Sequence, residues 1–175
     1  MEREQVQEAI DTAFGGLSIP KRRTIIGDVD AKDRLSAETF RRDIAGKSWQ
    51  NLTPKFLAEW WAWYGYLTPE AYRYYVAALM TEALKNFEES YGLIYSAVAA
   101  LSPSLASLYH EGCDANLRSK QSTLTMPQCS AICAFLELAF GLGTGRAKHH
   151  AAQALHWGWN QINTPALAAA NSYYH

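Results

Sequence analysis

Repeated junctions of Ser or Thr with Pro divide this chain, and they constrain its fold more than any other feature. The junctions are Thr53-Pro54, Thr68-Pro69, Ser102-Pro103, Thr125-Met126-Pro127 and Thr164-Pro165. The hydroxyl accepts a hydrogen bond from an unpaired amide at a helix start, and proline in the first helical turn has no amide to lose. Because their spacing has no fixed period, the junctions indicate successive helix starts and not the units of a solenoid.

Together with hydrophobic periodicity, these signals predict a series of helices. The predicted helices span residues 2–14, 36–45, 54–64, 69–98, 103–110, 127–140 and 145–160. The long segment 69–98 is expected to break near Asn86 or Gly92, and Gly141 lies where a C-terminal cap belongs. Only Arg23–Val29 has β-branched character, and one short segment cannot form a sheet. The sequence predicts an all-α, single-domain bundle of about six or seven helices with at most one short strand.

The length and composition of the chain agree with one helical domain over residues 1–175. Its core is expected in residues 35–160, and mobile polar loops are expected at 15–35 and 111–124. The 16 Lys and Arg nearly balance the 17 Asp and Glu, so no net field favours nucleic acid. The odd count of three cysteines favours a reducing compartment. The amphipathic N-terminus is no secretory signal, and no apolar run is long enough to span a membrane. We expect a cytoplasmic protein without membrane or nucleic-acid partners.

The aromatic-rich segment Leu52–Tyr75 covers two of the predicted helices. On the first, Phe56, Trp60 and Trp63 share an apolar face that is typical of a helix half-buried in a core, and Trp61 lies at the margin of that face. On the second, Tyr74 lies opposite the apolar arc, on the side of Glu70, Thr81 and Lys85. Either a further helix covers that side, or Tyr74 is an exposed contact residue. Trp and Tyr dominate binding hot spots, so Trp61 and Tyr74 are candidates for partner binding.

Several residue groups resemble chemical sites without meeting their requirements. Cys129 and Cys133 face together, but they share that face with Leu136 and Phe140, as buried cysteines of a core do. Adjacent helical metal ligands need a spacing of three or four residues, and no pair among the histidines has it. Those histidines are His149, His150 and His156. The glycines in GLGTGR follow a predicted helix, whereas a phosphate-binding loop follows a strand. We therefore predict no catalytic residues, no metal ligands and no cofactor, and expect no enzymatic activity.

The central sequence contains a spaced pattern: a Phe, then Gly-Lys-x-Trp and Leu-Thr-Pro, then a second Leu-Thr-Pro-Glu-Ala-aromatic-Arg-Tyr-Tyr. Its elements are Phe40, Gly46-Lys47-Ser48-Trp49, Leu52-Thr53-Pro54 and Leu67–Tyr75. In this pattern the chain resembles a family of uncharacterised bacterial helical proteins. After Tyr75 the chain reads Val-Ala-Ala where the pattern has Leu-Pro-Ala. The resemblance implies a single-domain helical fold and no established activity, so it transfers no catalytic residue, and Glu70, Arg73, Tyr74 and Tyr75 are motif positions only.

The leading hypothesis is a non-enzymatic binding protein, specifically an immunity protein that neutralises a cognate bacterial toxin or effector by blocking its active site. This rests on the surplus of aromatic residues and on analogy with small helical proteins encoded beside toxins. The expected contacts are off-core aromatic and acidic side chains, the latter suited to toxins that bind phosphate-bearing substrates. They are Trp61, Tyr74, Glu70, Glu59, Asp28 and Asp30.

The first alternative is a structural or regulatory homo-oligomer, such as a homodimer. In it, Trp61 and Tyr74 are buried against a second copy of the chain. The second is an enzyme of unrecognised type that uses the Arg73–Tyr74 or the His149–His156 edge.

Overall fold

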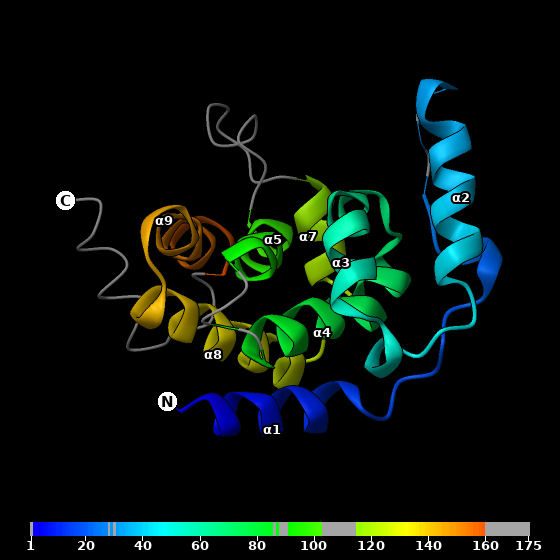
Figure 1. Ribbon diagram of the computed structural model, residues 1–175. Helices are drawn as coiled ribbons and strands as arrows, with labels where there is room; N and C mark the ends of the chain where they lie inside the picture. The colour runs from blue at the N-terminus through cyan, green and yellow to red at the C-terminus, as the bar shows by residue number, and fades with distance from the viewer. Residues whose placement is uncertain are drawn as a thin grey trace.

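The computed structural model describes residues 2–27, 29, 31–85, 87, 91–102 and 115–159, and this part of the chain is all-α (Figure 1). The α-helices are α1 (Arg3–Phe14), α2 (Arg34–Ile44), α3 (Pro54–Trp60), α4 (Pro69–Lys85), α5 (Tyr91–Leu101), α7 (Ala115–Gln121), α8 (Met126–Leu142) and α9 (Gly145–Gln153). The short helices are η1 (Arg22–Thr24), η2 (Ala31–Asp33), η3 (Trp49–Asn51), η4 (Trp61–Tyr66) and the π-helical turn η5 (Ala154–Gly158). β-Pairing in the described residues is limited to an isolated bridge between Ile26 and Leu67. The predicted all-α class is confirmed.

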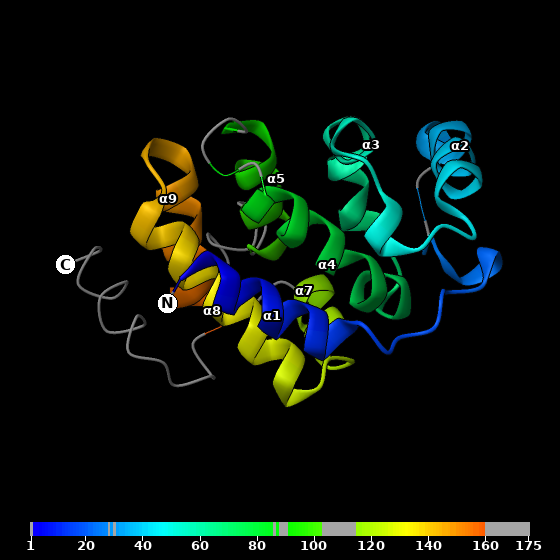
Figure 2. The same cartoon turned by 60° about the horizontal axis from the view of Figure 1, so that its bottom comes forward.

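Two long helices, α4 and α8, lie at the centre of the fold. In Figure 1, α1 runs below them and α5 and α9 lie above them. The contacts agree, because α1 packs on α8 and α4, α5 packs on α4 and α9, and α9 packs on α8. Turning the molecule shows α2 and α9 at opposite ends of the row of helices (Figure 2). None of the described helices is both long and apolar enough to cross a membrane.

Helix α4 is buried on nearly all sides. Its buried residues run almost without interruption from Ala71 to Leu84, and they include the polar Thr81 and Glu82. Thr81 accepts a hydrogen bond from the amide of Gln7 on α1 at 3.1 Å, so α1 covers the side of α4 that a single apolar stripe would leave in water. The middle of a helix surrounded in this way has little contact with solvent, and its pattern of apolar residues does not separate two sides.

The buried tyrosines of this region hydrogen bond to the backbone. The hydroxyl of Tyr64 donates to the carbonyl oxygen of Tyr75 at 3.2 Å. The hydroxyl of Tyr75 donates to the carbonyl oxygen of Ile44 at 3.2 Å, which ties the end of α2 to α4. Burial raises the pKa of both phenols well above the ordinary tyrosine value, because their charged forms are poorly solvated there. These hydroxyls are structural donors.

The predicted helix starts are confirmed where the structure describes them. Thr53 accepts from the amide of Phe56 at the start of α3, and Thr68 accepts from the amide of Ala71 at the start of α4, both at 3.2 Å. Thr125 and Gln128 form a reciprocal capping box at the start of α8. The junctions at Pro103 and at 164–165, and the helix predicted over 103–110, lie outside the described residues.

Several predicted boundaries shift in the structure. The long segment breaks after Lys85, as expected, and α5 begins at Tyr91. The predicted helix 54–64 is α-helical only to Trp60 and continues as the 3-10 helix η4. Gly141 is not the cap of α8, because the helix runs on to Leu142 and Gly143 donates its amide to the carbonyl of Ala139 at 2.9 Å.

Structure also occurs in segments that were expected to lie outside the core or to be loops. Val6, Ile10 and Phe14 of α1 are fully buried, so the core begins well before residue 35. The segment 15–35 contains η1 and η2, and the segment 111–124 contains α7. A polar composition predicted loops there, but α7 packs on α4, and tertiary contacts outweigh weak local preferences.

Helix α2 stands at the edge of the molecule and packs through one face. Phe40 on that face lies 6.3 Å from Phe56 and 5.4 Å from Trp60, measured between ring centroids. On the exposed side, Glu38 pairs with Arg22 at 2.7 Å and with Arg41 at 2.6 Å. The hydrogen bond from Arg22 holds the pKa of Glu38 below its ordinary value. This pairing balances part of the positive charge of Arg22 and Arg41.

Candidate partner-binding surface

Three segments that are distant in the sequence meet where α4 begins. The first link is Thr68, whose hydroxyl donates to the carbonyl oxygen of Thr24 at 2.5 Å and whose amide donates to that of Ile25 at 3.1 Å. Next to it, the amide of Gly27 donates to the carbonyl oxygen of Tyr66 at 3.0 Å. These backbone bonds hold the segment after α1 against the entry to α4.

Gln128 joins the same region to α1 and α8. Its Oε1 accepts from the amide of Thr125 and from Nε of Arg73, both at 3.0 Å, and its Nε2 donates to the carbonyl oxygen of Ala13 at 3.1 Å. Only 1% of Gln128 is exposed, and each of these bonds is partly buried. Thr123 adds a bond from its hydroxyl to the carbonyl oxygen of Pro69 at 3.3 Å. The ends of α1, α4 and α8 are therefore fixed relative to one another.

Exposed apolar side chains lie on each of the joined segments. Met126 in the first turn of α8 is 68% exposed, Ile19 after α1 is 43% exposed and Tyr66 before α4 is 40% exposed. Glu70 in the first turn of α4 is also exposed. We call these four residues the α4 N-terminal surface. Exposed apolar side chains and a carboxylate, on segments that hydrogen bonds hold together, are typical of a preorganised protein-binding surface.

The structure places the predicted contact residues in different settings. Glu70 lies on the α4 N-terminal surface. Tyr74 does not, because it is only 3% exposed and its ring packs edge-on against Tyr75, with centroids 4.8 Å apart. Of the two alternatives left open for Tyr74, the structure supports the buried one and not the exposed contact residue, because α4 is covered on the side that the helical pattern assigned to water.

The other predicted contact residues do not add to the α4 N-terminal surface. Glu59 is exposed on α3, and the hydrogen bonds that join the three segments do not include it. Trp61 is the first residue of η4, but its side chain lies outside the described part of the structure. Asp28 and Asp30 also lie outside the described residues.

Sequence reasoning missed Ile19, Tyr66 and Met126. Met126 precedes Cys129 by three residues, so helical periodicity groups it with the core stripe of α8. Its exposure results from its place in the first turn, at the very edge of the bundle. Ile19 and Tyr66 belong to no α-helix, and nothing in the sequence distinguishes an exposed apolar residue of this kind from a buried one.

The cysteines of α8 are buried, as the apolar residues that share their face suggested. Cys129 and Cys133 are buried free thiols, and burial, followed by Glu137 and Cys129, raises the pKa of Cys133 to about 12. His149 is exposed, while the His150 ring packs edge-on against Tyr95 with centroids 5.2 Å apart. Among the described residues, no group of three or more His, Cys, Asp or Glu side chains is placed to hold a metal ion.

Comparison with known proteins places this all-α chain in a class whose function is not established. Residues 2–163 match the model of a family of unknown function, DUF6714, and the chain belongs to that family. Neither the curated proteins nor the solved structures that were compared include a match.

Proposed function

We propose that this protein is a non-enzymatic binding protein that docks a partner protein through its α4 N-terminal surface. The observation that supports the proposal is the exposure of Ile19, Tyr66 and Met126 on segments that partly buried hydrogen bonds hold together. A preformed surface loses little conformational entropy on binding, and Met and Tyr are enriched in interface cores, whereas charged side chains are typical of the rim.

The partner that we propose is a cognate bacterial toxin or effector, which this chain would neutralise as a cytoplasmic immunity protein by covering its active site. The exposed acidic Glu70 suits a basic cleft that binds phosphate-bearing substrates. The immunity role itself rests on analogy with other small helical proteins. The burial of Tyr74 removes one proposed contact from both the immunity hypothesis and the homo-oligomer alternative.

The test of this role is co-expression with the protein encoded beside it. We expect the intact chain to restore growth of cells that express the neighbouring protein and to bind that protein in a pull-down assay. Light scattering of the purified chain should give a mass that does not change with concentration. Failure to restore growth, or a mass that rises with concentration to that of a dimer, would contradict the proposal.

A matched pair of substitutions tests the surface. Met126→Asp places a charge in the contact area, and we expect it to weaken partner binding by about tenfold or more in calorimetry. Because an acidic residue is favourable in the first turn of a helix, the variant should fold normally. Leu35→Asp is the control, since Leu35 is 82% exposed in the first turn of α2 and lies outside the surface. Equal binding by Met126→Asp and the wild-type protein, or equal weakening by both variants, would rule out this surface.

A further inference from the structure

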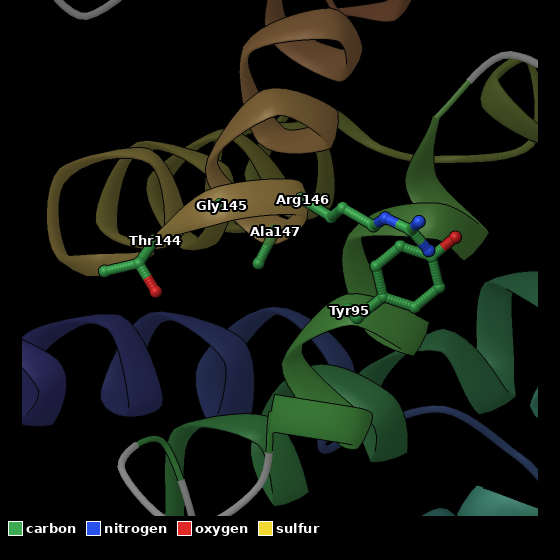
Figure 3. A pocket seen from close by; sticks show the side chains of 5 residues that line it. All are labelled: Tyr95, Thr144, Gly145, Arg146 and Ala147. Atoms are coloured by element: carbon green, nitrogen blue, oxygen red, sulfur yellow. The ribbon is translucent and has the colours of Figure 1, made fainter.

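A separate pocket lies between α5 and the beginning of α9, and the function proposed above does not use it. Its volume is about 300 Å³. The residues that line it are Tyr95 of α5 and Thr144, Gly145, Arg146 and Ala147 at the start of α9 (Figure 3). Ligand pockets in proteins begin at roughly this volume, so the space suits a small molecule.

The two walls of this pocket are fixed to each other. The hydroxyl of Ser102, just after α5, donates to the carbonyl oxygen of His150 on α9 at 3.1 Å. The ring of His150 packs against Tyr95, which lies in the pocket wall. At the other end, Gly145 has a φ of +52°, a conformation that side chains disfavour, and it directs the chain from α8 into α9. The pocket is therefore formed by the fold before any ligand binds.

The lining combines one cation with apolar surface. Arg146 is the charged side chain among the described lining residues, and Figure 3 shows it reaching from α9 toward Tyr95. The ring of Tyr95 and the methyl group of Ala147 provide apolar contacts. No acidic residue occurs in the sequences of α5 or α9, and α9 also carries Lys148. The charge of Arg146 also contributes, after burial and His149, to the lowered pKa of His150.

We propose that this pocket binds a small carboxylate with an apolar body, such as an aromatic or short aliphatic acid. The guanidinium of Arg146 pairs with the carboxylate through two parallel hydrogen bonds, and the apolar body lies against Tyr95 and Ala147. Arginine suits this task because its planar donors match the geometry of a carboxylate. Binding of this carboxylate involves no covalent step and no metal.

The proposal is tested by titrating the full chain, labelled with ¹⁵N, with four probes: benzoate, hexanoate, benzamide and inorganic phosphate. We expect saturable shifts of the Tyr95, Gly145 and Ala147 amide signals with benzoate or hexanoate below about 10 mM. Benzamide, which lacks the charge, and phosphate, which lacks the apolar body, should bind at least about tenfold more weakly. Absence of saturable shifts, or equal binding of benzamide or phosphate, would overturn the proposal.

Variants assign the charge to Arg146. Because Arg146 is exposed, Arg146→Gln should fold normally, which circular dichroism checks, and should lose about tenfold or more in carboxylate affinity. Arg146→Lys should retain part of the affinity, since it keeps the charge without the paired donors. Arg118→Gln, at an exposed arginine on α7, is the matched control and should bind as the wild-type protein does. Unchanged affinity in Arg146→Gln, or an equal loss in Arg118→Gln, would overturn the assignment.

Discussion

At the scale of single residues, Gln128 shows how one polar side chain of the core joins several helices. It is neutral, so it is buried without the desolvation cost of a charge, and it offers both an acceptor and a donor. Its partners are Thr125 in its own helix, Arg73 in α4 and Ala13 in α1. One amide group thus caps α8 and fixes the positions of two neighbouring helices.

We predict that Gln128→Leu lowers the free energy of unfolding by about 2–4 kcal/mol, because it leaves buried donors and a carbonyl oxygen without partners at nearly constant volume. Urea denaturation measures this loss. Gln153→Leu is the control, since Gln153 is half-buried on α9 and makes no hydrogen bond through its side chain to the described residues. A loss no larger than that of the control would show that Gln128 has only a packing role.

At the scale of elements, helix starts follow local chemistry closely and helix ends follow it less well. Hydroxyl caps begin α3, α4 and α8 as their sequences indicate, because the capping residue and the amide that it accepts are a few residues apart. At the C-terminal ends, the glycine nearest the end of the hydrophobic periodicity is not always the cap of the helix. α2 is followed by Gly46 with a φ of +76°, whereas α8 passes through Gly141 before it ends.

We predict opposite effects of alanine at these two glycines. Gly46→Ala should lower the free energy of unfolding by about 1 kcal/mol, because a side chain is strained at a positive φ. Gly141→Ala should raise it by about 0.5–1 kcal/mol, because Gly141 is helical, nothing lies within 4 Å of the added methyl group, and alanine restricts the unfolded chain. Thermal and urea denaturation compare the two variants with the wild-type protein, and changes of the same sign would contradict this prediction.

At the scale of the whole molecule, stability depends on pH through groups that are buried where helices meet. His150 lies between α9 and α5, and its pKa is lowered from the ordinary value of 6.5, first by burial and then by the charges of His149 and Arg146. Since the folded protein binds this proton less readily than the unfolded chain does, His150 favours folding above the ordinary histidine pKa. That contribution is lost as the pH falls below 6.5 toward the lowered value.

We therefore predict that the free energy of unfolding decreases as the pH is lowered from about 7.5 to about 5.5, and that His150→Gln reduces this slope. Urea denaturation at a series of pH values measures both proteins. Glu38 does not interfere, because a carboxylate with a lowered pKa loses its contribution only below its ordinary value of 4.5. An equal slope in the variant would show that the pH dependence in this range originates elsewhere.

Features that depend on neighbouring residues could be predicted from the sequence, and features that depend on residues far apart in the chain could not. The sequence by itself determined the all-α class, the capped starts at Thr53, Thr68 and Thr125 and the break after Lys85, because these depend on neighbouring residues. It also indicated the buried cysteine face of α8. It did not place α7 or the cap of α8, and it left Tyr74 open between a buried and an exposed position.

Only the tertiary structure decided which faces of the helices meet water. Tyr74 is buried and Met126 is exposed, although helical periodicity gives the opposite assignment for each. The reason is physical: periodicity reports how residues are distributed around one helix, whereas exposure depends on how many other helices surround it. α4 is covered by α1 and α5, and Met126 lies at the edge of the bundle, so the candidate surface and the α5–α9 pocket exist only in the assembled fold.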